Sequence, residues 1–237
     1  MNNESTDQGV ALVAGCNGAL GVALSNLLVD EGYVVVGCSR RAAQLERAGF
    51  QHIATDASTE SGVKDVMAAV DAAPGQLKAV VINMAVPSAG VLALVRQVDL
   101  ARVLQTNVIG PTLLIGQAMR RMMRHRFGRL VGMGSIRARQ PVVGAGAYAV
   151  SKSALEQLFR QAAVEGAAYG ITANVVSISL LESGMSEELS EEQKKTLLNG
   201  CLQSEPCSTG DVCNAVEFFL RRESSLVTGQ VLRLGFF

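Results

Sequence analysis

The chain has 237 residues, 49% of them hydrophobic, and its 21 Lys and Arg residues are balanced by 21 Asp and Glu residues. This length suits one α/β domain, and the neutral balance argues against nucleic acid as a partner. The polar start lacks the basic and apolar regions of a signal peptide, and no apolar run is long enough to span a bilayer, so we expect a cytoplasmic protein.

Cysteine and histidine usage narrows the chemistry further. Five cysteines are present, an odd number, and no two have the C-x-x-C spacing, so a disulfide framework is not predicted. Only two histidines occur. This excludes a His-rich metal site, disfavours a Ser-His-Asp hydrolase and leads us to expect no metal ion.

From residue 10 onward, short apolar runs alternate with amphipathic segments. Strands are predicted at 10–14, 33–38, 51–55, 78–83, 128–134, 171–178 and 228–234. Helices are predicted at 19–31, 41–49, 59–72, 97–126 (interrupted at Gly110-Pro111), from about 147 to 168, at 186–200 and at 209–222. Apolar strands alternating with helices predict a single-domain, Rossmann-like, doubly wound parallel sheet of about seven strands with helices on both faces. The domain covers 9–237, after a flexible tail at 1–8.

A glycine-rich loop follows the first predicted strand and opens the first helix. Glycines at such a turn allow a tight bend and a close approach of the backbone to a pyrophosphate, which binds at the helix N-terminus. The alternative is a tight turn that only packs. The candidate cofactor-binding residues here are Gly15, Asn17, Gly18, Leu20 and Gly21.

The second strand ends in Ser39, Arg40 and Arg41, with no acidic residue. An acidic side chain at this point holds the ribose 2′-hydroxyl of NAD, whereas a guanidinium pairs with the 2′-phosphate of NADP. Ser39 and Arg40 therefore predict NADPH in preference to NADH. The alternative is that the arginines are the solvated start of a helix.

Polar groups also follow the next two strands. Asp56 and Ala57 come after the third strand, where a carboxylate could accept from an adenine amino group or, alternatively, cap a helix. Asn83 and Ala85 follow the fourth strand, at the edge where open α/β sheets bind ligands. Asn107 lies within a helical run and indicates little by itself.

Tyr148 and Lys152 lie four residues apart in a helical run, so they share one face of the helix. A positive charge beside a phenol lowers its pKa and suits it to general acid–base catalysis. Ser135, thirteen residues before the tyrosine, could hydrogen-bond a substrate oxygen. Taken alone, the Tyr-x-x-x-Lys pair is more often part of an ordinary amphipathic helix.

Together these motifs resemble the short-chain dehydrogenase/reductase family over nearly the whole chain. The resemblance implies roles for four catalytic residues. Tyr148 is the proton donor, Lys152 lowers its pKa and binds the nicotinamide ribose, Ser135 orients the carbonyl, and Asn107 belongs to the proton relay. Both Tyr148 and Lys152 also count as cofactor-binding residues.

Within the family, the chain most resembles the β-ketoacyl-(acyl carrier protein) reductases, partly through the segment 183–193. The resemblance implies NADPH-dependent reduction of a β-ketoacyl thioester, with an acidic carrier protein bound near the active-site mouth at Arg124, Arg126 and Arg129. The alternative is that these cations complement the helix dipole. It further implies a homo-oligomer, a dimer or a tetramer.

Several positions depart from the family pattern, namely Ala19, Val86 and Ile178-Ser179. We expect Ala19 to crowd the phosphate loop, and the other two to change how the cofactor is held. Two alternatives stay open: a reductase or dehydrogenase of another small alcohol or ketone, such as a sugar, steroid or secondary metabolite, and a non-catalytic partner subunit of a sister reductase.

Overall fold

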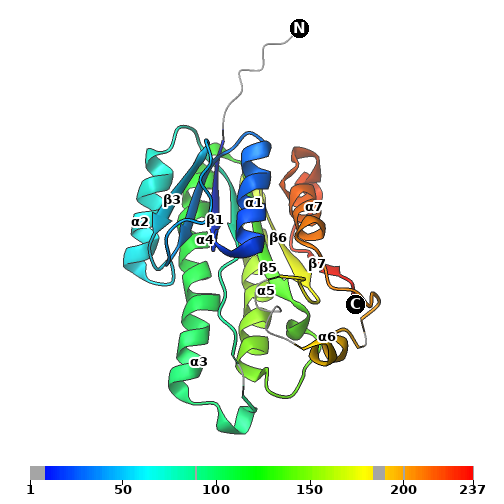
Figure 1. Ribbon diagram of the computed structural model, residues 1–237. Coiled ribbons are helices and arrows are strands. Elements are labelled where there is room, and N and C mark those ends of the chain that lie inside the picture. The colour runs from blue at the N-terminus through cyan, green and yellow to red at the C-terminus, as the bar shows by residue number, and fades with distance from the viewer. Residues whose placement is uncertain (1–8, 89, 184–189, 200, 237) are drawn as a thin grey trace.

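The computed structural model describes residues 9–88, 90–183, 190–199 and 201–236. Seven parallel strands form one sheet in the order β3-β2-β1-β4-β5-β6-β7 (Figure 1). The strands are β1 (Val10–Ala14), β2 (Val34–Ser39), β3 (Phe50–Ala54), β4 (Leu77–Ile82), β5 (Gly128–Ser135), β6 (Ile171–Ile178) and β7 (Val231–Leu234). The predicted fold class is therefore confirmed.

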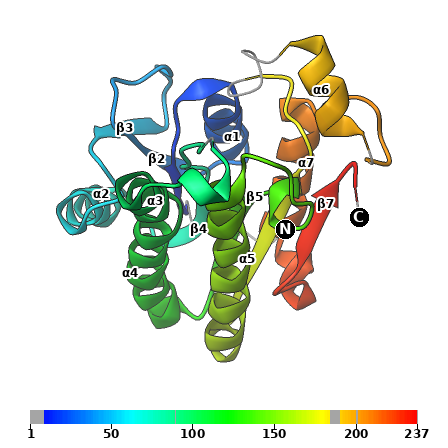
Figure 2. The same ribbon diagram turned by 90° about the horizontal axis from the view of Figure 1, so that it is seen from below.

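Helices cover both faces of the sheet (Figure 2). On one face, α2, α4 and α5 pack against each other and the strands, and on the other face α1 packs against α7. The helices are α1 (Gly18–Asp30), α2 (Glu60–Ala72), α3 (Gln97–Leu104), α4 (Gly110–His125), α5 (Gly146–Gly166), α6 (Glu191–Leu198) and α7 (Thr209–Leu220). Shorter turns are η1 (Leu92–Leu94), η2 (Gln105–Ile109), η3 (Ile136–Ala138), η4 (Ala167–Tyr169) and η6 (Arg222–Leu226).

Because every strand runs in the same direction, all carboxyl ends meet at one edge of the sheet. The chain order reverses between β1 and β4, which pair directly. Ligands of open α/β sheets bind outside the carboxyl ends at such a reversal. The glycine loop after β1 and Asn83 after β4 therefore lie side by side, as their hydrogen bond confirms: Asn83 Nδ2 donates to the Gly15 carbonyl at 2.7 Å.

The helix predicted at 41–49 is wrong. The segment between β2 and β3 consists of bends and a turn. Its polar groups are bound by α1 instead of forming a helical ladder: Arg47 donates to Asn26 Oδ1 at 2.9 Å and forms an ion pair with Asp30. Helical periodicity in so short a segment was outweighed by these contacts.

The interruption predicted at Gly110-Pro111 is also wrong. The α3 helix continues through a π-helical turn, η2, directly into α4. Pro111 lies in the first turn of α4, where its missing N–H costs little. The irregularity is thus the wider turn at 105–109, which places Asn107 inside the molecule with 1% of its surface exposed.

Two further predictions concern the ends of the chain. The helix predicted at 186–200 corresponds to α6 in part, since residues 184–189 and 200 lie outside the described residues, as does the predicted tail at 1–8. Across the described parts of the chain, no helix has both the length and the apolar character needed to cross a membrane.

Candidate active site

Ser135, Tyr148 and Lys152 are brought together at the carboxyl edge of the sheet. Ser135 is the last residue of β5, and the other two lie in the first turns of α5, which packs beside that strand. The Ser135 hydroxyl acts on the Tyr148 phenol, whose pKa it lowers. Ser135 Oγ also accepts a hydrogen bond from the Arg137 backbone N–H at 3.3 Å. A substrate oxygen placed at this pair would meet two hydroxyl groups.

Lys152 is a buried cation behind the tyrosine. Its Nζ donates to the Met133 carbonyl at 2.7 Å and lies 5.7 Å from the centroid of the Tyr148 ring. Only 3% of the residue is exposed. Burial lowers the pKa of the Lys152 ammonium to about 8, because removal from water disfavours the charged form. The group can therefore change its charge close to neutral pH.

The pKa of the Tyr148 phenol moves in the opposite direction from our expectation. Burial raises it, and this effect outweighs the lowering by the Ser135 hydrogen bond and by the charge of Arg137. Lys152 is not among the groups that shift this pKa in the structure, so its lowering effect stays a prediction. A phenol whose pKa is raised carries its proton at neutral pH, which suits a proton donor.

The Asn107 side chain is hydrogen-bonded to a neighbouring loop. Its Oδ1 accepts from the Val86 N–H at 2.8 Å, and its Nδ2 donates to the Val86 carbonyl at 3.0 Å and to Ser151 Oγ at 3.0 Å. Ser151 in turn donates to the Tyr148 carbonyl at 2.7 Å. Asn107 therefore connects the loop after β4 to the helix that carries the tyrosine.

Sequence reasoning missed Arg137, which lies on η3, two residues after Ser135. The side chain is partly buried, and its charge and the Tyr148 phenol act on each other. Burial lowers the pKa of its guanidinium, while Cys201 and Tyr148 oppose that shift. The signal in the sequence was its position, since Arg137 lies two residues after the predicted catalytic serine.

A pocket of about 240 Å³ opens at the same edge of the sheet, at the point where the strand order reverses, and Ser135, Tyr148 and Lys152 are not among its lining residues. Its wall is built from the loops that follow β1, β2, β3 and β4. Most of the predicted cofactor-binding side chains line it. The lining residues are Gly15, Asn17, Cys38, Ser39, Arg40, Arg41, Thr55, Asp56, Ala57, Asn83, Met84, Ala85 and Thr106.

The glycine loop approaches its neighbours too closely for larger side chains. A Cβ on Gly15, which has a φ of 87°, would lie 2.7 Å from the Met84 nitrogen. A Cβ on Gly21 would lie 2.4 Å from the Gly15 carbonyl oxygen. Gly21 thus packs the first turn of α1 against the loop, and the Leu20 side chain belongs to the core rather than to the pocket. Any contact of Leu20 with a cofactor would use its backbone.

The same loop is bound to the segment between β2 and β3. Asn17 donates to the Ala42 carbonyl at 2.7 Å and accepts from the Gln44 N–H at 3.1 Å. The Gly18 N–H donates to Gln44 Oε1 at 2.7 Å. Gln44, which sequence reasoning also missed, therefore occupies a backbone donor that the glycine motif offers to a phosphate.

At the end of β2 the pocket carries hydroxyl and guanidinium groups. The Ser39 hydroxyl donates to the Arg41 carbonyl at 2.9 Å and pairs with His52 Nε2 at 2.8 Å, so the imidazole is the donor in that bond. Arg40 is exposed and lines the pocket. None of the described residues Ser39, Arg40 and Arg41 is acidic, which favours a 2′-phosphate over a free ribose hydroxyl.

Asp56 is held in place by its own turn. Its Oδ1 accepts from Ser58 N at 3.0 Å and from Ser58 Oγ at 2.7 Å. Burial would raise the pKa of Asp56, but the two Ser58 hydrogen bonds and the charge of Arg40 together lower it. The carboxylate is therefore ionised at neutral pH and can accept from an amino group in the pocket.

The residues that surround this pocket match a known family. The family model described as enoyl-(acyl carrier protein) reductase matches residues 15–234. The chain belongs to the short-chain dehydrogenase/reductase family.

Relatives include 3-oxoacyl-[acyl-carrier-protein] reductase FabG of Salmonella typhimurium, 25% identical over 232 residues, and FabG of Escherichia coli, 26% identical over 232 residues. Both alignments cover 95% of this chain and 95% of the relative. Solved structures with the same fold include gluconate 5-dehydrogenase from Burkholderia cenocepacia in complex with NADP and tartrate (TM-score 0.89, 21% identity, 96% of this chain and 94% of that chain). ElxO with NADP bound is a second (TM-score 0.86, 21% identity, 95% and 96%).

The short-chain dehydrogenase/reductase family is a family of oxidoreductases, and the pocket of this chain fits a nicotinamide dinucleotide. Gly15 lies so close to Met84 that the chain presents backbone, not a side chain, where the strand order reverses. Asp56 adds a carboxylate that can accept a hydrogen bond. The Ser39–Arg41 turn and Asn83 complete the wall of the pocket.

The departures from the family pattern have local explanations. Ala19 is exposed, and a Cβ built on the adjacent Gly18 would meet nothing within 4 Å, so the expected crowding of the phosphate loop is absent. Val86 is buried, and its backbone is held by Asn107. Ser179 Oγ lies 3.5 Å from Cys207 Sγ, which ties the loop after β6 to the segment before α7.

The expected basic patch for a carrier protein needs correction. Arg129 is 2% exposed and donates to the carbonyls of Gly128, Gly170, Arg221 and Arg222, so it cannot contact a partner. Arg124 and Arg126 are exposed but lie before β5, whereas Ser135 ends it. The ends of this strand of 8 residues are about 23 Å apart. Within one chain, these arginines are not at the mouth of the active site.

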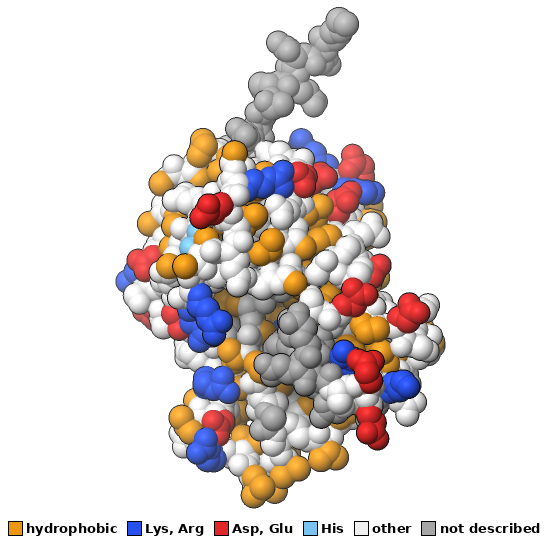
Figure 3. All heavy atoms as spheres, viewed as in Figure 1, with side chains coloured by type: hydrophobic (Ala, Val, Ile, Leu, Met, Phe, Trp, Pro, Cys, Tyr) orange, Lys and Arg blue, Asp and Glu red, His pale blue; other side chains and the backbone are white. Residues whose placement is uncertain are grey.

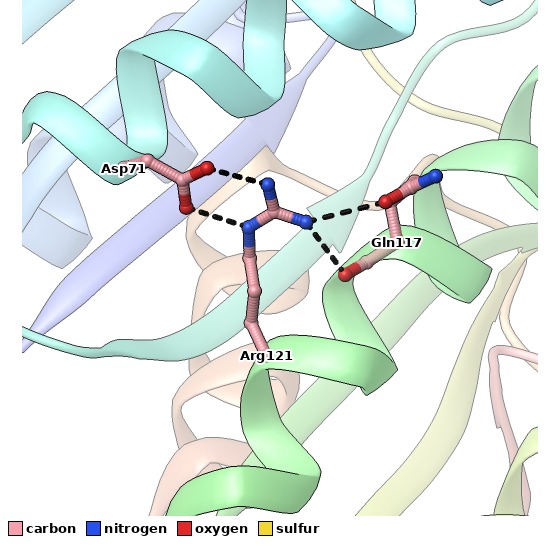
Figure 4. A network of polar contacts seen from close by, with 3 residues as sticks. All are labelled: Asp71, Gln117 and Arg121. Atoms are coloured by element: carbon pink, nitrogen blue, oxygen red, sulfur yellow. Dashed lines mark hydrogen bonds and ion pairs between the residues drawn. The ribbon is translucent and has the colours of Figure 1, made fainter.

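Arg121, another member of that arginine-rich stretch, is also internally engaged. Its Nε and one terminal nitrogen donate to the two carboxylate oxygens of Asp71 at 2.7 and 2.6 Å, and the other terminal nitrogen donates to Gln117 (Figure 4). The bidentate pair joins α4 to α2. The hydrogen bonds from Arg121 lower the pKa of Asp71.

Proposed function

We propose that the protein reduces a ketone to a secondary alcohol with NADPH, and that the ketone is the β-carbonyl of a 3-oxoacyl thioester. The observation that carries the proposal is the cluster of Ser135, Tyr148 and Lys152 at the carboxyl edge of the sheet, the edge at which the dinucleotide pocket also opens. The FabG relatives, which span 95% of the chain, support the thioester as the substrate class.

The chain's own residues have distinct tasks in this reaction. When bound, the nicotinamide supplies hydride to the carbonyl carbon. Ser135 holds the carbonyl oxygen, and Tyr148 transfers its proton to that oxygen as negative charge develops there. The resulting phenolate is stabilised by the nearby Lys152 ammonium and the Arg137 guanidinium. Asn107 holds the loop after β4 in a fixed position relative to the start of α5.

The description of the matching family model names an enoyl reductase, whose substrate is a carbon–carbon double bond. The two hydroxyl groups of Ser135 and Tyr148 provide a site for an oxygen atom, since each can donate to it. This geometry supports a carbonyl substrate. Reduction of another small ketone remains the second candidate, because the same groups would act on any ketone oxygen.

NADPH is the proposed cofactor because the turn after β2 offers hydroxyl and guanidinium groups and no carboxylate among Ser39–Arg41. We further propose a homo-oligomer. Val150 and Val164 on α5 are 54% and 74% exposed, as expected of a helix that another subunit covers. Docking of an acyl carrier protein stays a prediction. Of the three arginines predicted to bind it, Arg124 and Arg126 are exposed.

The proposal is tested by NADPH consumption with the 3-oxobutanoyl thioester of N-acetylcysteamine. The wild type should consume NADPH, Tyr148→Phe should be at least about 10²-fold slower, and Tyr169→Phe, which changes a tyrosine on η4, should match the wild type. A thermal-shift titration with NADPH should show that Tyr148→Phe still binds the cofactor.

Full activity of Tyr148→Phe would remove the tyrosine from the mechanism. A wild type that neither binds NADPH nor consumes it would instead support a non-catalytic subunit, and co-purification with a sister reductase would then be expected.

A further inference from the structure

Arg137 lies directly beside the catalytic cluster and takes no part in the mechanism so far except through its charge. It is the middle residue of η3, the single turn that follows Ser135. Its backbone N–H is bound to Ser135 Oγ, which fixes the start of the side chain relative to the catalytic hydroxyl. The turn also packs against α5, the helix of Tyr148.

Its guanidinium has no acceptor among the residues that the structure describes, although the side chain is partly buried. Other arginines behave differently. Arg139, two residues on, has its Nε 3.7 Å from Glu156 Oε2, and the buried Arg129, at the other end of β5, donates to several backbone carbonyls. No Arg137 nitrogen is among the fully enclosed polar atoms without a partner, so its guanidinium reaches solvent and has donors available for a ligand.

The charge of the guanidinium acts on the catalytic phenol. Its charge and the Tyr148 phenol influence each other, and the other group on which it acts is the Cys201 thiol. A ketone oxygen held by Ser135 and Tyr148 therefore places the adjoining part of the substrate close to Arg137.

We propose that Arg137 binds a second acceptor oxygen of the substrate, next to the ketone, and thereby selects 3-oxo compounds over simple ketones. This inference rests on the carbonyl reduction proposed above and specifies the substrate for that site. The second oxygen belongs to a thioester carbonyl or to a free carboxylate. A guanidinium donates to both, and a carboxylate gains the additional charge attraction.

The test compares three substrates: the 3-oxobutanoyl thioester of N-acetylcysteamine, 3-oxobutanoate, and 2-butanone, which lacks the second oxygen. In the wild type, kcat/KM for at least one 3-oxo compound should exceed that for 2-butanone. In Arg137→Gln this preference should fall about 10- to 100-fold, the range expected for a hydrogen bond to a charged group. Arg137→Lys should restore part of it, and Arg139→Gln, a partly exposed arginine two residues away, should keep it.

The arms distinguish the source of the oxygen. A larger loss with 3-oxobutanoate assigns the carboxylate, and a larger loss with the thioester assigns the thioester carbonyl. Equal losses with all three substrates would mean that Arg137 only supports the fold, and an unchanged preference would mean that it touches no substrate. Either result overturns the proposal.

A binding measurement separates this inference from the failure of the proposed reaction. If the wild type reduces none of the three compounds, calorimetry with 3-hydroxybutanoate in the presence of NADPH still tests Arg137. Binding to the wild type that weakens at least tenfold in Arg137→Gln supports the oxygen site even though the proposed reduction has failed. Absent binding, or equal binding to both proteins, overturns it.

Discussion

Both ends of the Asn107 side-chain amide are hydrogen-bonded to the backbone of Val86, at 2.8 Å from its N–H and 3.0 Å to its carbonyl. The amide thus makes the two hydrogen bonds to Val86 that a neighbouring strand would otherwise make. Without it, the N–H and carbonyl of Val86 would be buried and unpaired at the edge of the sheet. The π-helical turn of η2 makes this possible, because it carries Asn107 inward.

Replacement of Asn107 should therefore cost stability as well as activity. Asn107→Ala leaves the N–H and carbonyl of Val86 without partners, and we expect the free energy of unfolding to fall by about 2–4 kcal/mol. Chemical denaturation measures this, with Asn214→Ala, an exposed position on α7, as the control that should change little. A stable but inactive Asn107→Ala would show that the side chain serves catalysis alone.

Lys152 should leave a signature in the dependence of stability on pH. Its pKa is lowered from 10.5 to about 8 in the folded chain, so between these values the unfolded state binds more protons. The stability contributed by this group is complete above about 10.5 and is lost as the pH falls towards 8. Between pH 8 and 10, the wild type should gain up to about 2–3 kcal/mol relative to Lys152→Met.

The measurement is chemical denaturation of both proteins at several pH values, which cancels the titration of the groups they share. Lys64→Met, an exposed position on α2, should follow the wild type. Parallel curves for wild type and Lys152→Met would show that the ammonium has an ordinary pKa.

Arg40 should control the choice between the two nicotinamide dinucleotides. The side chain is exposed at the pocket, and its charge lowers the pKa of Asp56. We expect Arg40→Gln to weaken NADPH binding about 10-fold or more, because a charge-assisted hydrogen bond to the 2′-phosphate is lost, and to change NADH binding little. Calorimetry with both cofactors measures this.

Arg47→Gln is the matched control for that experiment, because its guanidinium is bound to Asn26 and Asp30 on α1. Equal weakening of both cofactors by Arg40→Gln would indicate a general charge effect, and the proposed selectivity would then have to reside elsewhere.

Two glycines of α4 should respond in opposite ways to alanine. A Cβ on Gly110 would lie 2.8 Å from Ser58 Cα, whereas a Cβ on Gly116 would meet nothing within 4 Å. Gly110→Ala should destabilise the protein and weaken NADPH binding, since Ser58 holds Asp56 in the pocket. Gly116→Ala should stabilise it by about 0.5–1 kcal/mol. Thermal denaturation with and without NADPH tests both, and equal effects would contradict the packing argument.

Most of the sheet could be predicted because its strands are buried on both faces. The 10–14 run is apolar throughout and the 171–178 run has five apolar residues among eight, and their bounds agree with β1 and β6. The catalytic cluster was predicted from the resemblance to the short-chain dehydrogenase/reductase family, which the glycine loop, Ser135 and the Tyr148–Lys152 pair supported together and not singly. Such local patterns do not depend on the rest of the fold.

Other features depend on contacts between distant parts of the chain. Burial of Arg129 requires the carbonyls near residues 170 and 221, and the irregular segment at 41–49 requires partners on α1. The inward turn of Asn107 requires a loop 21 residues earlier. A role for Arg137 beside Tyr148 could have been suspected from the sequence. That its guanidinium has no acceptor among the described residues is seen only in the three-dimensional structure.

The apolar character of the lower end of the molecule is a further feature that depends on the three-dimensional structure. Hydrophobic side chains gather there in Figure 3, at the end that holds η1 and the start of α3 in Figure 1. Leu92 and Leu94 are 74% and 76% exposed. Gly90 lies close to this segment and donates to the Gly144 carbonyl at 2.9 Å, which links the segment to the start of α5.

The contact between Gln44 and Gly18 has a consequence for cofactor binding. A phosphate that binds the Gly18 N–H must first displace the Gln44 carbonyl oxygen, so the dinucleotide exchanges one acceptor for another instead of filling a vacant position. The contacts of the loop between β2 and β3 then depend on whether a phosphate is bound at the Gly18 N–H. Hydrogen exchange at residues 42–47 should speed up when NADPH binds if the loop is released, and Gln44→Ala should remove that response.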